Sequence, residues 1–370
     1  MDRFRVTKCE MVKLQVEMEK AQMNDLAVIL LNWNNYSDTI ECLKSLREQD
    51  MKNFTIIVID TGSENDSVSR ILDTIDEQET LVLDYRKSYD DAITTEEIHP
   101  PLSTYQLVII RCKENFGFAK ANNIGIKYAI ADNYKAVMLL NNDTILAENC
   151  LRVMYERLFV GAGIDVVIPT IYYYDDPTKI WNCGGEPIAF GRKKRYSSEE
   201  ASSHGDAHEY ETKLVTGCAL VAKKCVFIQY GVLDDSFFFG EEDTEFSERM
   251  NNNHVKMLCL KDATLWHKVS SSQPKNSGGN IIRKTILEFS NRMVRYRRSH
   301  SALQSAAVFE LYNILLLLVC MRSQNSRPNV KAMRRISTLF RATASRSSVD
   351  REAYRNIMDE YNKITGAYNG

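Results

Sequence analysis

The chain has 370 residues, of which 44% are hydrophobic and 26% charged, with a formal net charge of −2 at pH 7. These values are typical of a folded protein with a sizeable core, and they exclude wholesale disorder. The near-neutral charge gives no reason to expect nucleic acid as a partner. The nine cysteines stand singly, without a CxxC pair. We therefore expect reduced thiols in a cytoplasmic protein, and neither a disulfide framework nor a zinc site.

Strand and helix patterns alternate along the first part of the chain. Residues 1–24 lack an apolar core, so they indicate a short helical segment and neither a signal peptide nor a membrane span. Buried strands are then expected at 26–33, 54–60, 106–112 and 136–143, and helices at 36–49, near 68–75 and at 118–132. This alternation predicts an α/β fold with a mostly parallel central sheet and helices on both faces.

The regular alternation is interrupted once and then gives way to a mixed pattern. Residues 84–105 are polar and contain two adjacent prolines, which predicts an inserted surface loop without chemistry. Beyond Asp143 we expect a strand at 164–174, a hairpin with a long polar loop at 180–211, a strand and short helix at 214–231, and one or two strands at 255–268. A polar stretch after Ser272 marks a linker to a helical region at 273–370.

Polar side chains follow three of the expected strands. Asp60 ends the second strand, where its carboxylate could accept a hydrogen bond from the imide N–H of uracil or thymine, with Asn32 or Trp33 beside the same nucleoside. Asp143 ends the fourth strand and offers the hard oxygen ligand that Mg²⁺ or Mn²⁺ needs to hold a diphosphate. The alternatives are helix capping by Asp60 and a simple Asn/Asp turn at Asp143.

The segment ENFGFAKANNIG precedes and begins a helix. Gly117 would allow backbone N–H groups to approach a diphosphate at the helix N-terminus, and Lys120 would add positive charge on the first turn. The alternative is a loop that needs glycine only for its turn.

Acidic and aromatic residues gather near the end of the α/β pattern. An aromatic run, expected to be a buried strand, delivers Glu241, Glu242 and Asp243 to the start of a helix. A carboxylate flanked by two others should have a raised pKa, which suits a general base, although a solvated acidic helix N-terminus is the alternative. His267 stands alone after an apolar pair, as a structural histidine or as a metal ligand. Trp181, in WNCGG, lines a cavity or belongs to a hairpin turn.

Seven segments in this order resemble the inverting nucleotide-sugar glycosyltransferases of family 2, which have a GT-A fold. They are LAVILLNWNN, IIVIDTGS, NFGFAKANNIG, LLNNDT, TGCALVAKK, FFFGEEDTEFSER and the WH of LWHK. The resemblance covers residues 25–272, which would form the catalytic domain. Within the family, the chain looks most like the rhamnosyl- and galactofuranosyltransferase-like branch that builds bacterial surface polysaccharides.

The resemblance implies a role for each matching residue. Asp243 would be the catalytic base, with Glu242 beside it, and Asp143 and His267 would bind a divalent cation, Mn²⁺ or Mg²⁺. Asn141 stands where the family often has Asp, so the metal site has one carboxylate fewer. The predicted nucleotide-sugar-binding residues are Asn32, Trp33, Asp60, Asn115, Gly117, Lys120, Asn123 and Asn142, and the predicted acceptor-binding residues are Trp181, Gly185 and Glu241.

The implied activity is transfer of a sugar, with inversion, from a nucleoside-diphosphate sugar to a hydroxyl of a glycan or lipid-linked acceptor. A base-reading Asp60 favours UDP- or dTDP-sugars as donors. One alternative is a sugar-phosphate nucleotidyltransferase, but the glycine-rich basic loop expected after its first strand is not present in NWNNYSDT. The other is a non-catalytic nucleotide-binding or scaffolding protein.

The C-terminal region combines an apolar stretch with a basic one. Residues 306–321 form an apolar run shorter than the ~20 residues of a spanning helix. The next residues, 322–349, contain seven Arg and Lys and no acidic residue. This pattern fits a peripheral contact with the inner face of the cytoplasmic membrane, as a lipid-linked acceptor would require. The alternative is a helix packed on the catalytic domain or at a homodimer interface.

Overall fold

A computed structural model describes residues 25–74, 80–85, 106–160, 163–203, 205, 207–269, 278–323 and 328–365. The predictions for the helix in 1–24, for most of the loop 84–105 and for most of the linker after Ser272 lie outside the described residues. Among the described cysteines, all are free thiols and all but Cys225 are buried.

The first half of the chain forms a parallel sheet with the order β5-β1-β2-β4-β3. Its elements are β1 (Leu26–Asn32), α2 (Tyr36–Arg47), β2 (Phe54–Asp60), α3 (Ser67–Leu72), β3 (Thr80–Tyr85), β4 (Leu107–Cys112), α4 (Phe118–Ala131) and β5 (Ala136–Asn141). The edge strand β3 was not expected from the sequence, and it begins before the predicted insertion. The register pairs Asn32 with Asp60 and Leu31 with Asn141, so the carboxyl ends of three strands lie at one edge.

The second half extends the same sheet in mixed directions to β11-β13-β7-β12-β5. Its elements are β6 (Thr144–Leu146), α5 (Cys150–Phe159), β7 (Val166–Tyr173), β8 (Ile180–Asn182), β9 (Gly185–Ile188), β10 (Arg192–Arg195), α6 (Ser198–Ser203), β11 (Glu209–Glu211), β12 (Ala219–Lys223), α7 (Lys224–Tyr230), α8 (Glu242–Asn252) and β13 (Met257–His267). Strand β12 runs antiparallel to both of its neighbours, and β9 and β10 form a separate hairpin. The predicted α/β fold class is confirmed.

Hydrophobic cores lie on both faces of the sheet. Alternate residues of β1 belong to different clusters: Ala27 and Ile29 pack on one face, and Val28 and Leu30 on the other. Because successive side chains of a strand point to opposite faces, a strand covered on both sides must be apolar throughout. This explains the continuous apolar runs that mark the strands in the sequence.

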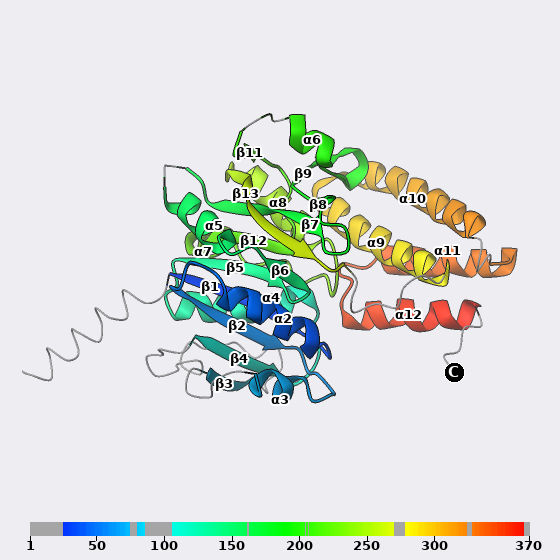
Figure 1. Ribbon diagram of the computed structural model, residues 1–370. Helices are drawn as coiled ribbons and strands as arrows, with labels where there is room; N and C mark the ends of the chain where they lie inside the picture. Colours follow the sequence, from blue (N-terminus) through cyan, green and yellow to red (C-terminus); the bar gives the residue numbers. More distant parts are fainter. Residues whose placement is uncertain are drawn as a thin grey trace, which may run out of the picture.

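Four C-terminal helices form a third cluster beside the sheet (Figure 1). They are α9 (Gly278–Ser299), α10 (Ala302–Arg322), α11 (Val330–Ala344) and α12 (Arg351–Thr365), as the helical C-terminal prediction required. Phe237 is buried in this cluster and forms an isolated bridge with Val349, whereas Phe239 is 49% exposed. The expectation of a buried aromatic strand at 237–239 is therefore wrong, because these residues form a turn whose first ring is covered by the helices.

Candidate active site

A buried chain of hydrogen bonds links the ends of β1, β2 and β5. Asn32 Nδ2 donates to Asp60 Oδ1 at 2.7 Å, and the Thr39 hydroxyl donates to Asn32 Oδ1 at 2.8 Å. Asn142 Nδ2 donates in turn to Thr39 Oγ1 at 2.8 Å. Asn32 is fully buried, so it orients Asp60 and does not touch a ligand, which corrects its predicted role. The half-buried Asn142 lies at the other end of the chain, and Thr39 was missed by the sequence analysis.

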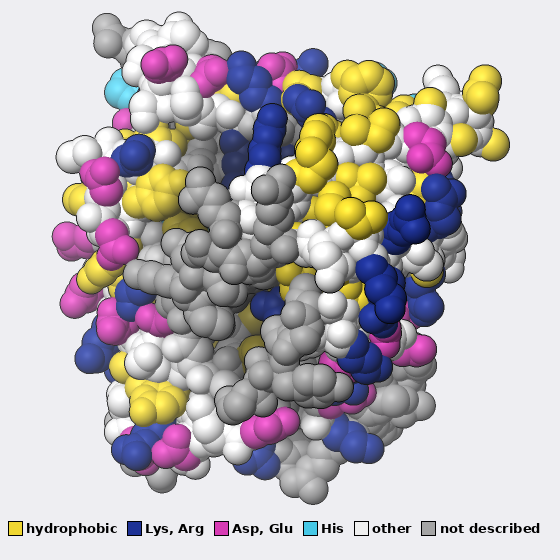
Figure 2. Space-filling model, turned by 90° about the vertical axis from the view of Figure 1, so that its right-hand side faces the viewer, with side chains coloured by type: hydrophobic (Ala, Val, Ile, Leu, Met, Phe, Trp, Pro, Cys, Tyr) yellow, Lys and Arg dark blue, Asp and Glu magenta, His cyan; other side chains and the backbone are white. Residues whose placement is uncertain are grey.

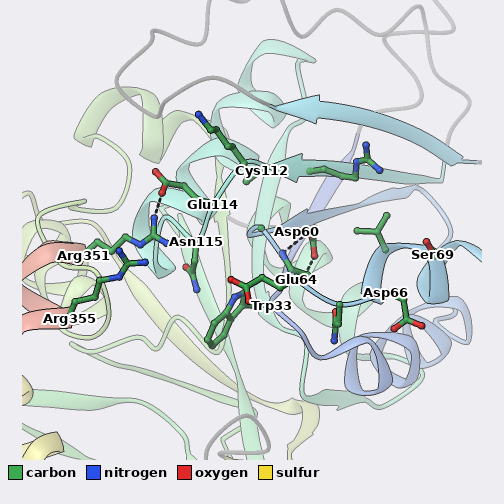
Figure 3. A pocket seen from close by; sticks show the side chains of 16 residues that line it. Trp33, Asp60, Glu64, Asp66, Ser69, Cys112, Glu114, Asn115, Arg351 and Arg355 are labelled. Atoms are coloured by element: carbon green, nitrogen blue, oxygen red, sulfur yellow. Dashed lines mark hydrogen bonds and ion pairs between the residues drawn. The ribbon is translucent and has the colours of Figure 1, made fainter. Parts of the chain in front are cut away.

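A pocket of about 520 Å³ opens beside this chain, above the ends of β2 and β4. Trp33, Asp60 and Asn115 line it together, as Figure 3 shows. The Trp33 ring is 51% exposed, and a flat aromatic surface of this kind suits stacking on a base. The structure therefore brings together three of the predicted nucleotide-binding residues.

The backbone N–H groups of Gly117 and Phe118 already have hydrogen-bond partners and are not free for a diphosphate. Its own N–H donates to Asn115 Oδ1 at 2.8 Å, and the N–H of Phe118 donates to Phe238 O at 2.9 Å. Its φ is +81°, and a Cβ at this position would lie 2.3 Å from Phe238 O. Glycine is needed here for close packing, so its predicted phosphate-binding role is corrected.

The other two residues predicted on α4 have different environments. Asn123 is buried, and its amide donates to Leu233 O at 2.8 Å and accepts from Leu233 N at 3.0 Å. It therefore holds the turn after α7 and is removed from the nucleotide-binding set. Lys120 is half-buried on the first turn of α4.

Asp143 and His267 lie together, as predicted for a metal pair. Strand β6 pairs with β13 in a register that places Thr144 opposite His267. Asp143 Oδ1 is then 3.0 Å from His267 Nε2, and both side chains are buried. Two adjacent ligands of an octahedral ion at ~2.1 Å would be about 3 Å apart, so the pair fits one edge of such a site.

This pair would hold a cation weakly without further ligands. Among the described residues, no group of three His, Cys, Asp or Glu side chains could hold a metal ion. Nδ1 of His267 is buried without a hydrogen-bond partner, whereas metal-binding histidines usually donate this second N–H to an acceptor. Oxygen ligands from a diphosphate and water would have to complete the coordination.

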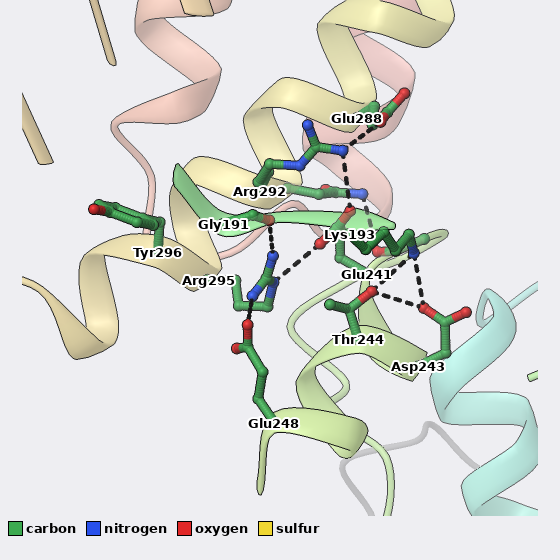
Figure 4. A network of polar contacts seen from close by, with 12 residues as sticks. Gly191, Lys193, Glu241, Asp243, Thr244, Glu248, Glu288, Arg292, Arg295 and Tyr296 are labelled. Atoms are coloured by element: carbon green, nitrogen blue, oxygen red, sulfur yellow. Dashed lines mark hydrogen bonds and ion pairs between the residues drawn. The ribbon is translucent and has the colours of Figure 1, made fainter. Parts of the chain in front are cut away.

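The pKa values of Asp243 and Glu242 are shifted in opposite directions because the two carboxyls have different neighbours. Burial and the adjacent Asp243 raise the pKa of Glu242 to about 8. Burial also acts on Asp243, but Lys193 and Arg195 outweigh it and hold its pKa below the usual value. Lys193 Nζ lies 3.3 Å from Asp243 Oδ1 and donates to Thr244 Oγ1 at 2.8 Å (Figure 4). The two shifts therefore act in opposite directions and favour the protonated form of Glu242 and the ionised form of Asp243.

Lys193 and Arg195 were missed by the sequence analysis. They are alternate residues of β10, whose sequence is RKKR, so they lie on one face of the hairpin. The spacing of two residues between these cations is typical of one face of a strand, but the segment was interpreted as part of a polar loop.

Glu241 and Gly185 are packed against other residues and are not available to contact an acceptor. Glu241 Oε2 accepts from Arg295 Nε at 2.9 Å, Oε1 lies 3.7 Å from Arg292, and the carboxylate side chain is only 4% exposed (Figure 4). Its φ of +75° also places it in the left-handed region. Glu241 therefore anchors the start of α8 to α9. Gly185 is buried in β9, where a Cβ would lie 2.3 Å from Lys194 O, so its predicted role is also corrected.

Trp181 and Arg195 lie between the Asp143–His267 pair and the carboxyl groups of Glu242 and Asp243. The Trp181 ring meets the His267 ring edge-on at 4.5 Å, and the Arg195 guanidinium lies over the indole at 5.2 Å. The charge of Arg195 also acts on Asp243. Trp181 and Arg195 therefore link the surroundings of His267 and Asp143 to those of Asp243.

Comparison with known proteins finds similarity to glycosyltransferases. The family model described as glycosyl transferase family 2 matches residues 27–208. A dTDP-rhamnosyl transferase, RfbF, from Shigella flexneri is 19% identical over 289 residues, covering 74% of this chain and 90% of the relative. A solved mannosyltransferase, PcManGT from Pyrobaculum calidifontis, in complex with GDP-Man and Mn²⁺, aligns with a TM-score of 0.49 and 14% identity over 95% of this chain and 92% of its own.

Proposed function

Since this chain belongs to glycosyl transferase family 2 and is a glycosyltransferase that uses a nucleotide-sugar donor, we propose that it transfers a sugar, with inversion, from a UDP- or dTDP-sugar to a hydroxyl of a glycan or lipid-linked acceptor. The observation that carries this proposal is the position of Asp243 at the start of α8, where its carboxylate lies 3.3 Å from Lys193 of the hairpin β9–β10. Arg195 of the same hairpin lies over the ring of Trp181, which in turn meets the His267 ring edge-on.

The donor class is supported by the hydrogen bonds that Asp60 already makes. Within the part of the chain that the structure describes, its Oδ1 accepts from Asn32 and from the Ser63 hydroxyl, at 2.7 and 2.6 Å, while Oδ2 accepts only from Ser63 N at 3.2 Å. A carboxylate oxygen accepts two hydrogen bonds, so one position remains on Oδ2. One acceptor position matches the single imide N–H of uracil or thymine. Guanine presents two adjacent donors, which would need both oxygens.

Asp243 acts as the general base in the proposed reaction. Its carboxylate takes the proton of the acceptor hydroxyl as the oxygen attacks the anomeric carbon. The bond from that carbon to the diphosphate breaks on the opposite face, and the nucleoside diphosphate leaves with the electron pair. Lys193 holds the Asp243 carboxylate and keeps it ionised for this task.

A divalent cation, Mn²⁺ or Mg²⁺, would be held by Asp143 and His267 together with the donor diphosphate. Such an ion supplies positive charge that stabilises the departing diphosphate. With only two protein ligands, we expect Mn²⁺ binding to depend on the nucleotide. Thermal stabilisation by Mn²⁺ plus UDP should exceed the sum of the separate effects, and His267→Ala should remove that excess.

The main test is a panel of UDP-, dTDP- and GDP-sugars, each assayed for donor hydrolysis and for thermal stabilisation with Mn²⁺. Turnover of a pyrimidine-nucleotide sugar is the expected result. Stabilisation by nucleotides without turnover of any donor would instead support a non-catalytic nucleotide-binding protein.

We also place the lipid-linked acceptor at a membrane surface reached by α10 and α11. Helix α10 has 21 residues and, among the described helices, is the one long and apolar enough to span a membrane. Tyr312 and Leu316 are nevertheless buried in the helical cluster, which favours a surface contact. Leu303, Ile314 and Met321 are 83%, 55% and 46% exposed.

The basic residues lie beside this apolar face. Lys331, Arg334 and Arg335 are exposed on α11, which packs against α10. Figure 2 shows hydrophobic side chains gathered on this side of the molecule, with Lys and Arg side chains next to them. An apolar stripe bordered by cations complements an anionic bilayer, where each cation contributes about 1 kcal/mol.

Vesicle flotation tests the membrane contact. The intact chain should float with vesicles that contain phosphatidylglycerol at low salt and should not float with neutral phosphatidylcholine vesicles. The double variant Arg334→Glu/Arg335→Glu should lose binding. The matched variant Lys44→Glu/Arg47→Glu changes the same charge on α2 and should bind normally. Equal flotation of both variants, or none by the wild type, would argue for the packed-helix alternative.

A further inference from the structure

The nucleotide pocket has one wall that lies outside the family 2 match. Its lining includes Arg351 and Arg355 of α12, beyond residues 27–208. Figure 3 shows both arginines projecting from α12 on the side of the pocket that faces Trp33 and Asn115. The C-terminal helical region therefore completes a cavity whose base is formed by the sheet edge.

Three contacts fix the start of α12 against this pocket. Arg351 forms an ion pair with Glu114, on the loop after β4. The rings of Tyr354 and Phe238 lie 4.9 Å apart. The backbone of Val349 accepts from Phe238 N at 2.8 Å and donates to Ser236 O at 2.9 Å. The helix is thus attached both to the donor side and to the segment that leads to Glu241 and α8.

Charges of both signs line the pocket. The cations are Arg111, Lys113 and the two arginines of α12, and the acidic residues are Asp60, Glu64, Asp66 and Glu114. Arg351 is held by Glu114, but Arg355, one turn further along α12, is exposed. A guanidinium that faces a pocket from a fixed helix can bind an anion or a base edge with little loss of side-chain freedom.

We propose that Arg355 binds the nucleoside diphosphate of the donor, so that α12 completes the nucleotide site. This inference rests on the proposed function for the identity of the ligand, and it adds a binding residue from the C-terminal region. Arg351 is a positioning residue, because its ion pair with Glu114 sets where Arg355 lies.

Isothermal titration calorimetry of the full chain tests the proposal, with UDP, dTDP and GDP as probes and uridine as the phosphate-free comparison. Arg355→Ala should weaken binding of the best nucleotide about tenfold, which is the loss of one charge-assisted hydrogen bond. Arg355→Lys should recover part of that loss. Arg334→Ala, which removes an exposed arginine from α11, should bind as the wild type does.

The outcomes separate this inference from the proposed function. A loss for nucleotides alone assigns the guanidinium to the phosphates, and an equal loss for uridine assigns it to the base; both support the inference. Unchanged affinity of Arg355→Ala, or no binding of any probe by the wild type, overturns it. If Arg355→Ala weakens binding while the wild type transfers no sugar, the inference stands and the proposed transferase substrates are wrong.

A second variant pair tests the positioning role of Arg351. Glu114→Arg places two arginines side by side and should weaken nucleotide binding through repulsion. The double variant Glu114→Arg/Arg351→Glu restores the ion pair with reversed charges and should recover the affinity. Equal affinities of the single and double variants would remove Arg351 from the proposal.

Discussion

The two regions proposed as the donor side and the acceptor side of the site are held together by different interactions. On the donor side, parallel strands in register place Asn32, Asp60 and Asn141 at one edge, and the neutral hydrogen bonds of Thr39 connect Asn32 with Asn142. On the acceptor side, the start of α8 is joined to the helix α9 by buried ion pairs of Glu241 with Arg292 and Arg295. The first arrangement follows from a repeated local pattern, whereas the second requires partners that are far apart in the sequence.

This difference has an energetic consequence. A buried ion pair gains little over a well-packed apolar contact, but removal of one partner leaves an uncompensated buried charge. A neutral hydrogen bond costs less to break, because only a polar group loses its partner. We therefore expect substitutions on the acceptor side to have larger effects than those on the donor side.

The largest expected effect is on catalysis. Asp243→Asn should lower sugar transfer by about 10²–10⁴-fold, the usual contribution of a general base, with nucleotide affinity nearly unchanged. Transfer rate and UDP binding are measured on the same preparation. Glu245→Gln, on the same helix and paired with Arg249, is the control and should keep most activity. Full activity of Asp243→Asn would remove the base assignment.

The next effect is on the stability of the acceptor side. Arg295→Met removes the main partner of Glu241 and should lower the free energy of unfolding by about 3–5 kcal/mol. Chemical denaturation provides the measurement. Lys363→Met breaks the exposed pair with Glu360 and should leave the midpoint unchanged. If the double variant Arg295→Met/Glu241→Met recovers the free energy of unfolding, the unpaired buried charge of Glu241 is the cause of the loss.

The third effect is a pH dependence from Glu242. Burial raises its pKa from 4.5 to about 8, so the unfolded chain releases a proton that the folded protein keeps. Glu242 therefore lowers the free energy of unfolding progressively as the pH rises from about 4.5 to 8. The non-ionising Glu242→Gln should gain stability relative to the wild type across that window, on the order of 1–3 kcal/mol. A difference that stays constant between pH 5 and pH 8.5 would contradict the raised pKa.

The smallest effect belongs to the donor side. Thr39→Val keeps the side-chain shape but leaves Asn32 Oδ1 and Asn142 Nδ2 without their shared partner. The expected loss of stability is about 1–3 kcal/mol, with nucleotide affinity reduced a few-fold through the reorientation of Asp60. Thr338→Val, exposed on α11, is the matched control. A loss as large as that of Arg295→Met would break the proposed contrast between the two sides.

The same contrast explains what the sequence could predict. Asp60 and Trp33 were placed at one pocket because apolar runs end just before them and parallel strands align their carboxyl ends. The pairing of Asp143 with His267 came from the family resemblance, since nothing in their spacing of more than a hundred residues requires it. The edge strand β3 was missed because its short apolar run precedes a polar stretch.

The errors concentrate where packing decides the role of a residue. Glu241 resembles an active-site carboxylate in sequence, but Arg292 and Arg295 on α9 neutralise it. Gly117 has the position of a phosphate-binding glycine, but Phe238 occupies the space in front of it. In both cases the deciding neighbour belongs to an element whose location the sequence does not reveal.

The fluorescence of two tryptophans can report on the two proposed sides of the site. Trp33 lies in the nucleotide pocket, and Trp181 touches the imidazole of His267. Emission from the first should respond to a stacked base, and emission from the second should be quenched by paramagnetic Mn²⁺. The variants Trp33→Phe and Trp181→Phe would separate the two signals, so stopped-flow fluorescence can establish whether nucleotide or cation arrives first.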